Sequence, residues 1–388
     1  MMKTILLAPD SFKDSMTAFD ACLAMETGLK RVFGKHVIYQ QMPMSDGGEG
    51  IVDTLVTATN GQKVTVTVEG PLPSMQVTSY YGLLGDGETA VIEMAKASGL
   101  ELLTISQRNP LLTSTFGTGQ LIQAALAHGI RRFIIGIGGS ATNDGGTGMA
   151  EALGAKFYDK YGSQLKMRGD TLTRIASIDL SGLDKRLMES TIDVACDVDS
   201  PLLGPTGATA IFSKQKGADQ LMQVQLEQGL SNLAELATEI SQKEFHLVPG
   251  SGAAGGLGFG LQLFCGGLLV SGVERVIEEL DLVKAIAKAD LIFTGEGSLD
   301  SQTSYGKVIA GLAKVAKAQK KPLIACVGRI DGDVRPLYLQ GVTAAFSILP
   351  KLDSLNHCLE QGPDNLAATC EAIGRLLSIK KDLSTLGK

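Results

Sequence analysis

Aspartate and serine side chains follow two of the apolar segments near the start of the chain. Asp10, Ser11 and Lys13 come directly after the first segment, and Asp46 stands in a second corner with the sequence SDGGEG. If both segments are parallel strands of one sheet, their carboxyl ends meet at one edge, where open α/β sheets bind ligands. A surface turn that caps a helix would also use aspartate and serine. The repetition of the pattern favours one shared cleft.

The densest run of glycines, residues 136–149, follows a further apolar segment. It opens with a G-x-G-x-x-A pattern at Gly136, and Asp159 stands about 20 residues after Gly138. This matches the fingerprint of dinucleotide-binding proteins and would indicate NAD. Residues 142–146, however, delay the helix that should begin inside the fingerprint. An NAD-dependent reductase of a small hydroxy acid is the alternative that this segment supports.

A second glycine-rich segment, GSGAAGG at 250–256, follows a long helical stretch and not a strand. It has the composition of a nest of backbone N–H groups, which binds anions. Because a chain with 47 glycines matches such patterns by chance, neither glycine-rich segment identifies a ligand by itself.

The chain contains neither the GxxxxGK[ST] motif nor the catalytic motifs of protein kinases. Phosphoryl transfer nevertheless needs only N–H groups around the phosphates, a cation, and often a carboxylate that accepts the hydroxyl proton. Asp197 after a predicted strand, Lys216 further along and Lys307 at the start of a predicted helix offer the charged groups. Taken singly, each lysine is more simply a solvated helix residue. The segment before Lys307 adds Gly295, Glu296, Gly297, Asp300 and Thr303.

Short apolar, β-branched segments alternate with helical patterns, which indicates a parallel sheet covered by helices. The expected buried strands are residues 4–8, 36–42, 131–136, 291–294, 322–327 and 343–349. Between residues 63 and 94 apolar and polar residues alternate around glycine-rich turns, which predicts antiparallel hairpins. We therefore expect an α/β protein: a Rossmann-like parallel-sheet domain with a second α/β domain inserted in it and a cleft between them. The expected domains are residues 1–65 plus 286–388, and residues 66–285.

The composition excludes several classes of protein. The 388 residues suffice for two or three domains, and the net charge of −6 without a basic cluster argues against nucleic-acid binding. No apolar segment reaches the roughly 20 residues of a membrane span, and the first residues lack the apolar core of a secretory signal. The six cysteines and four histidines show no disulfide or zinc spacing, which fits a reducing cytoplasm.

Together these segments resemble one family, the bacterial glycerate kinases of type 1, which use ATP and make 2-phosphoglycerate. The resemblance covers nearly the whole chain and keeps the family order. The matching stretches are APDSFK (8–13), SDGGEG (45–50), TFGTGQLI (115–122), GIGGSATNDGGTGM (136–149), CDV with PLLGPTGA (196–208), QKGA (215–218), GSGAAGGLG (250–258), TGEG with LDSQT (294–303) and GK (306–307).

The resemblance implies a small hydroxy acid bound between two α/β domains, with the ATP phosphates on glycine-rich turns. It also implies Mg²⁺ held largely through phosphate oxygens, with Asp197 or Glu296 as protein ligand and no Cys/His metal site. The expected partner is a small-molecule substrate, without nucleic acid or membrane, and both a monomer and a homodimer are compatible with the sequence.

On this resemblance Asp197 is the expected general base for the glycerate hydroxyl, and Asp46 is its nearest rival. Lys13, Lys216 and Lys307 are the expected cations for the transferred phosphate. The residues expected to bind substrate or nucleotide are Asp10, Ser11, Gly138, Gly139, Asn143, Gly252, Gly255, Gly256, Gly295, Glu296, Gly297, Asp300, Thr303 and Lys307.

Three residues depart from the family pattern. Asp14 stands where the family often has Gly or Glu, Ser200 where Asn is common, and Ser298 where an arginine is expected. Without that arginine the site lacks a planar cation that could hold a carboxylate or phosphate in two places. A two-domain sugar-acid sensor that closes on its ligand without reacting is a further alternative, and the sequence leaves open whether the 2- or the 3-hydroxyl receives the phosphate.

Overall fold

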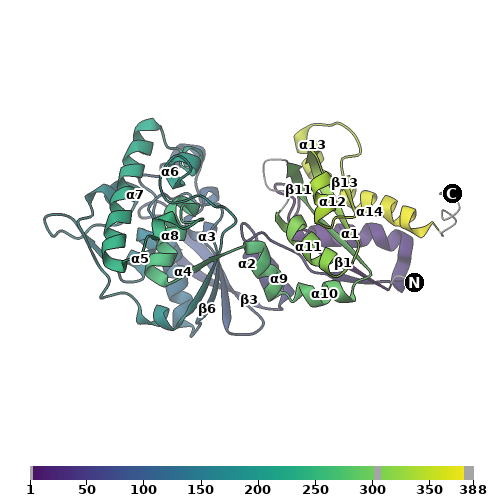
Figure 1. The fold of residues 1–388 in the computed structure, drawn as a ribbon, viewed down its shortest axis with the longest axis horizontal. Helices are drawn as coiled ribbons and strands as arrows, with labels where there is room; N and C mark the ends of the chain where they lie inside the picture. Colours follow the sequence, from purple (N-terminus) through teal and green to yellow (C-terminus); the bar gives the residue numbers. More distant parts are fainter. Residues whose placement is uncertain (1–2, 301–306, 380–388) are drawn as a thin grey trace. The chain divides into compact units, whose positions relative to one another are not determined.

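The computed structural model describes residues 3–300 and 307–379, which form two compact units (Figure 1). Unit 1 lies within residues 1–46 and 276–388, and unit 2 is residues 47–275. The chain therefore leaves the first unit and later returns to it. Both changes of unit come earlier along the chain than the expected boundaries at 65/66 and 285/286, and the assignment of the units as domains stays a prediction.

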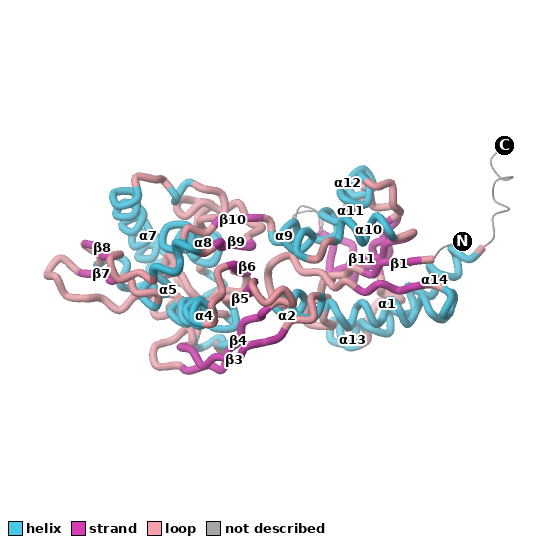
Figure 2. The backbone as a smooth tube through the Cα atoms, turned by 90° about the horizontal axis from the view of Figure 1, so that it is seen from below, coloured by secondary structure: helices cyan, strands magenta, loops and turns pink. Residues whose placement is uncertain are grey.

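Unit 1 is built on a parallel sheet whose described strands run in the order β13-β12-β11-β1-β2. These strands are β1 (Thr4–Leu7), β2 (Ile38–Gln41), β11 (Leu291–Asp300), β12 (Leu323–Asp331) and β13 (Ala344–Ser347). The helices are α1 (Ala18–Phe33), α10 (Leu282–Lys288), α11 (Lys307–Ala318), α12 (Arg335–Gln340), α13 (Leu355–Glu360) and α14 (Gly362–Ser378). Figure 2 shows α10, α11 and α12 on one face of the sheet and α1 and α14 on the other, so the predicted α/β class is confirmed.

The first helix shows how the local sequence sets its own limits. Thr17 is the N-cap of α1, and its hydroxyl accepts from the N–H of Asp20 while the Asp20 carboxylate accepts from the N–H of Thr17. This reciprocal capping box satisfies two donors that a helix start leaves free. Lys30 and Arg31 in the last turn complement the negative end of the helix dipole.

Unit 2 is built on a mixed sheet whose described strands run in the order β10-β9-β6-β5-β4-β3. These are β3 (Gln62–Glu69), β4 (Gln76–Leu83), β5 (Thr89–Glu93), β6 (Arg132–Gly136), β9 (Thr191–Ala195) and β10 (Leu268–Val270), and β7 (Lys156–Tyr158) pairs separately with β8 (Ser177–Asp179). The first three strands are antiparallel, which confirms the predicted hairpins, and β5, β6, β9 and β10 are parallel. The helices are α2 (Ile51–Ala58), α3 (Ala95–Ser98), α4 (Phe116–Ala127), α5 (Thr147–Ala152), α6 (Ala208–Phe212), α7 (Gln220–Ser241), α8 (Ala253–Cys265) and, at the unit boundary, α9 (Gly272–Glu279).

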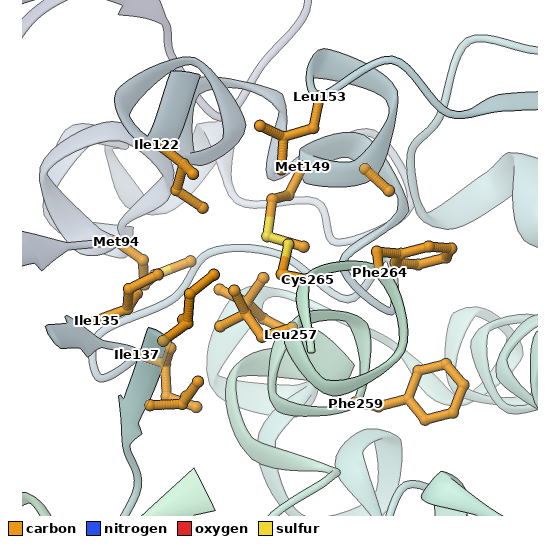
Figure 3. Packing of buried hydrophobic residues seen from close by; sticks show 14 of the residues in the cluster. Met94, Ile122, Ile135, Ile137, Met149, Leu153, Leu257, Phe259, Phe264 and Cys265 are labelled. Atoms are coloured by element: carbon orange, nitrogen blue, oxygen red, sulfur yellow. The ribbon is translucent and has the colours of Figure 1, made fainter. Parts of the chain in front are cut away.

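The hydrophobic core of unit 2 joins its sheet to α4, α5 and α8. Figure 3 shows Ile122, Met149 and Leu257 from these helices packed near Ile135 of β6, and all four side chains are fully buried. Burial of each such side chain contributes about 1.5–3 kcal/mol. This buried core therefore fixes the central strands, including their carboxyl ends, against α4, α5 and α8.

The segment TGEG differs from its predicted conformation. The predicted strand ends at residue 294, but β11 continues through Gly295 and Gly297 to Asp300 and stays paired with β12. A Cβ atom at Gly295 would lie 2.0 Å from the carbonyl oxygen of Cys326, so only glycine permits this pairing. Among residues 3–300 and 307–379 we find no helix with the length and hydropathy that a membrane crossing requires.

Candidate active site

Four parallel strands of unit 2 end at one level. The register pairs Glu93 of β5 with Gly136 of β6, Gly136 with Ala195 of β9, and Ala195 with Val270 of β10. The segments after these residues therefore leave the sheet at one edge, the usual place for ligands in an α/β protein. The predicted site residues carried by these segments are Gly138, Gly139, Asn143 and Asp197.

Residues 47–50 cross this edge of the sheet. A Cβ atom at Gly47 would lie 2.6 Å from the Cβ of Ala195, and a Cβ at Gly136 would lie 2.5 Å from the carbonyl oxygen of Gly47. Gly47 also has a φ of +90°, which residues with side chains rarely adopt. Gly47 is thus required because the backbone passes directly over the strand ends.

Glu93, the last residue of β5, holds residues 47–50 through a hydrogen bond. The residue is only 1% exposed, and its Oε2 accepts from the N–H of Gly50 at 3.0 Å. Its Oε1 lies 3.5 Å from Nζ of Lys96. Burial raises the pKa of Glu93 to about 7, although Lys96 acts against this shift. No motif in the sequence around Glu93 indicates this burial.

A cavity of about 330 Å³ opens beside Asp197. The Oδ1 atom of Asp197 accepts from the N–H of Gly272 at 3.1 Å, and Gly272 is the first residue of α9. The carboxylate therefore lies at the start of α9. The lining residues are Cys196, Asp197, Val198, Asp199, Pro249, Leu269, Val270 and Ser271. This volume is at the lower end of the range for ligand sites and suits a small acid.

The loop after β6 exposes backbone at its beginning and is buried further on. Gly138 and Gly139 are exposed, and Gly139 has a φ of +73°. Asn143 is 0% exposed, its Nδ2 donates to the hydroxyl of Thr209 at 3.5 Å, and its Oδ1 has no hydrogen-bond partner among the described residues. The glycines are accessible to a ligand, whereas Asn143 lies inside unit 2.

Asp144, which the sequence analysis also passed over, anchors the buried part of this loop. Its carboxylate accepts from the N–H and the hydroxyl of Thr115, both at 2.8 Å, and from the N–H groups of Gly146 and Gly148 at 3.1 and 3.2 Å. These donors stand at the starts of α4 and α5, where the helix dipoles favour a negative charge. Burial raises the pKa of Asp144, and these hydrogen bonds act against the shift.

The second glycine-rich segment packs against this loop. Gly252, Gly255 and Gly256 are buried. A Cβ atom at Gly255 would lie 2.0 Å from the carbonyl oxygen of Thr142, and one at Gly256 would lie 2.9 Å from the Cα of Gly145. A Cβ at Gly252 would meet another carbonyl oxygen at 2.1 Å. The structure thus gives these three glycines a packing role within unit 2.

Lys216 is not the solvated helix residue of the simpler sequence interpretation, because it is only 1% exposed. Its Nζ donates to the Oγ of Ser140 at 2.8 Å and to the carbonyl oxygen of Thr142 at 2.6 Å. Burial lowers its pKa from the ordinary value of 10.5 to about 7, and the charge of Asp144 acts against this shift.

Unit 1 has a second candidate binding region, at the strand ends where the strand order reverses. There β1 lies between β2, the next strand along the chain, and β11, which comes much later. The N–H of Asp10 donates to the carbonyl oxygen of Gly295 at 2.8 Å, and the Asp10 carboxylate accepts from the N–H of Ser11 at 2.6 Å. A Cβ at Gly297 would lie 3.3 Å from the backbone nitrogen of Lys13. These residues therefore meet at a topological switch point.

Other predicted residues follow the same strand ends of unit 1. Met44 donates its N–H to the carbonyl oxygen of Pro9 at 2.8 Å, which carries Asp46 to the edge where β1 ends. Glu296 is half-buried on β11, and the side chain of Lys13 is exposed. Asp300 ends β11 and Lys307 begins α11, whereas Thr303 lies outside the described residues. Ser298 pairs in the register with Arg329 of β12, so an arginine stands next to the departing position.

The dinucleotide fingerprint is not matched in three dimensions. The helix after β6 begins only at Thr147, and Asp159 follows β7, which pairs antiparallel with β8 outside the main sheet. This is not the βαβ unit that the fingerprint requires. The structure gives the NAD alternative no support.

Comparisons with known proteins agree on one family. The sequence profile of the glycerate kinase family matches residues 5–378. The chain is similar to a glycerate kinase of Bacillus subtilis, with 46% identity over 98% of this chain and 99% of that protein. It is also similar to a glycerate 2-kinase of Escherichia coli, with 44% identity over 97% and 98%. A crystal structure described as glycerate kinase 2 from Salmonella typhimurium matches with a TM-score of 0.88 and 43% identity, over 97% of this chain and 98% of that one.

Proposed function

The chain belongs to the glycerate kinase family, and on this basis we propose that it transfers the γ-phosphoryl group of ATP to the 2-hydroxyl group of D-glycerate. The structural observation that carries the proposal is the carboxyl edge of unit 2. There, the exposed backbone after β6 and the carboxylate-lined cavity after β9 follow neighbouring strands.

We assign the cavity beside Asp197 to glycerate and the exposed backbone of Gly138 and Gly139 to the phosphates of ATP. The cavity volume of about 330 Å³ supports the first assignment, because glycerate is a small acid. Glycine N–H groups at the end of a strand support the second, because they approach phosphate oxygens without side-chain interference.

Asp197 acts as the general base in this proposal. It takes the proton of the glycerate hydroxyl as that oxygen bonds to the γ-phosphorus, and the bond between the γ-phosphorus and the β–γ bridging oxygen breaks to release ADP. The hydrogen bond from Gly272 at 3.1 Å supports this role, because it fixes the carboxylate toward the helix start. Asp46 of unit 1 remains the rival base.

Lys13 remains the proposed cation for the transferred phosphate, because its side chain is exposed beside the switch point of unit 1. Lys216 is a weaker choice for that role, since its Nζ is buried and bonded within unit 2. Asp10, Ser11, Gly295, Glu296 and Gly297 keep their proposed role in ligand binding at this corner.

The residues present fit Mg²⁺ carried on the phosphates of ATP. The described residues contain no group of three or more His, Cys, Asp and Glu side chains that could hold a metal ion. Mg²⁺ in kinases commonly needs only one or two carboxylates besides phosphates and water. Asp199 lines the same cavity as Asp197 and would hold the ion, with Asp197 or Glu296 as alternative ligands. When bound, Mg²⁺ neutralises charge that develops on the phosphate oxygens.

The direct test incubates the protein with ATP, Mg²⁺ and D-glycerate and follows the products by phosphorus NMR. We expect ADP and 2-phosphoglycerate. Reduction that depends on NADH without ATP consumption, or glycerate binding without any product, would instead support one of the two alternatives. Formation of 3-phosphoglycerate would overturn the proposed regiochemistry.

The role of Asp197 is tested by the Asp197→Asn variant. Loss of a general base lowers turnover by about 10²–10⁴-fold, and the fold should be retained because the amide oxygen can still accept from Gly272. Asp53→Asn is the matched control, because Asp53 is an exposed aspartate of unit 2 on α2. Near wild-type turnover of Asp197→Asn would show that another residue is the base.

A further inference from the structure

Lys216 is a buried cation that the proposed reaction does not use directly. It closes the short 3-10 helix Lys214–Lys216, and the N–H of Lys216 donates to the carbonyl oxygen of Ser213 at 3.0 Å. The two bonds from its Nζ run to Ser140 and Thr142 of the loop after β6. Hydrogen bonds from an ammonium group are roughly twice as strong as neutral ones. Lys216 therefore ties two segments that lie far apart in the sequence.

Other parts of this loop are held by backbone bonds. The carbonyl oxygen of Gly139 accepts from Leu100 and the N–H of Ala141 donates to Ser98, both at 2.9 Å. These bonds alternate with the contacts of Lys216 to residues 140 and 142. The hydroxyl of Thr142 has no hydrogen-bond partner among the described residues. The hydrogen bond from Nζ of Lys216 to the carbonyl oxygen of Thr142 is therefore the polar contact that fixes this residue against the segment of Lys216.

A buried lysine destabilises the folded protein more than an apolar side chain would, so packing alone does not explain its presence here. Burial of an ammonium group is strongly unfavourable unless hydrogen bonds and a nearby anion compensate it. Here two oxygens of the loop accept from Nζ, and Asp144 supplies the nearby negative charge. All of these partners belong to the segment that begins with the exposed glycines Gly138 and Gly139.

We propose that Lys216 is a positioning residue that fixes the loop at Ser140 and Thr142 and thereby holds the backbone of the exposed residues Gly138 and Gly139 in place for the phosphates of ATP. The identity of the ligand rests on the proposed function, whereas the anchoring of the loop does not.

Hydrogen exchange of the ligand-free protein, measured by mass spectrometry, tests the anchoring. We expect Lys216→Met to speed exchange in peptides that cover residues 139–146 by about tenfold or more, while the core strand β6 keeps its protection. Lys214→Met is the matched control, because Lys214 is exposed on the same short helix. Unchanged exchange in the loop, or equally faster exchange throughout unit 2, would overturn the proposal.

The Ser140→Ala variant provides a milder test that retains the lysine. It removes one acceptor of Nζ and should also speed exchange of the loop, by a smaller factor. If Lys216→Met does not fold, an unchanged loop in Ser140→Ala is enough to reject the anchoring.

Steady-state kinetics tests the functional consequence. A misplaced loop should raise the KM for ATP and lower kcat, together by about 10–100-fold in kcat/KM, with little change in the KM for glycerate. The effects of Ser140→Ala and Lys216→Met should not add, because both remove the same contact. Additive effects, or a rise in the KM for glycerate alone, would contradict the proposed role. If the wild-type protein made no phosphoglycerate, the proposed function would fail while the exchange result still decided the anchoring.

Discussion

The buried ammonium group of Lys216 makes the stability of the protein depend on pH in a predictable direction. Burial lowers its pKa from 10.5 to about 7, so between these values the unfolded chain binds a proton that the folded protein does not. The contribution of Lys216 to the free energy of unfolding therefore rises with pH from about 7 to about 10.5, and this contribution is lost as the pH falls back to 7. Lys216→Met removes this dependence without a large change in side-chain volume.

The magnitude follows from linkage. One proton of difference corresponds to about 1.4 kcal/mol per pH unit. Because Lys216 is half protonated near pH 7, the free energy of unfolding of the wild type relative to Lys216→Met should rise by about 1.5 kcal/mol between pH 7 and pH 8.5. The difference in the free energy of unfolding between the two proteins at a single pH is less informative. Loss of two hydrogen bonds destabilises the variant, whereas loss of a buried charge stabilises it.

Urea unfolding followed by circular dichroism at pH 7.0 and 8.5 measures this difference for the wild type, Lys216→Met and the control Lys214→Met. NMR of protein labelled at the lysine Cε carbons gives an independent measurement, because one resonance should titrate near pH 7 and be missing in Lys216→Met. A stability difference that does not change with pH, together with no lysine titrating below pH 9, would refute the reasoning.

Two further predictions concern the segment that crosses the sheet edge. Gly136→Ala should lower the free energy of unfolding by about 1–3 kcal/mol, because the new Cβ would lie 2.5 Å from the carbonyl oxygen of Gly47; an unchanged melting temperature would show that the backbone yields freely. The free energy of unfolding of Glu93→Gln relative to the wild type should rise by about 2–3 kcal/mol between pH 4.5 and 7. Burial raises the pKa of Glu93 to about 7, so in this range the unfolded wild-type chain releases a proton that the folded protein keeps, and the wild type loses stability. Parallel pH–stability curves for the two proteins would contradict this assignment.

The class of fold, and the location of several candidate site residues at strand ends, could be predicted because they depend on local patterns. Apolar segments alternating with helical patterns predict a parallel sheet, and the alternation between residues 63 and 94 predicts β3, β4 and β5. Aspartate and glycine corners after strands predict a common edge, since parallel strands end on the same side. The places of Asp10 and Asp197 just after the ends of β1 and β9 were predicted this way, and their roles stay predictions.

The buried charges could not be predicted from the sequence. Glu93 and Lys216 look like ordinary surface residues in their local sequence, and their burial depends on which distant segment covers them. The roles of the glycines were equally hidden, because Gly255 packs on Thr142 across a contact between residues more than a hundred positions apart. A glycine that lets two backbones touch and a glycine that lets a ligand approach have the same signature in a sequence.

The order of the strands in unit 1 also governs how the chain can be made. Ile5, Leu6 and Leu7 of β1 are fully buried, but one neighbour of this strand, β11, is synthesised roughly 250 residues after β2. At about 5–20 residues per second, a ribosome leaves that edge without its partner for ~10–50 s. During this interval the nascent chain can complete the sheet of unit 2, while one edge of the apolar strand β1 has no partner strand.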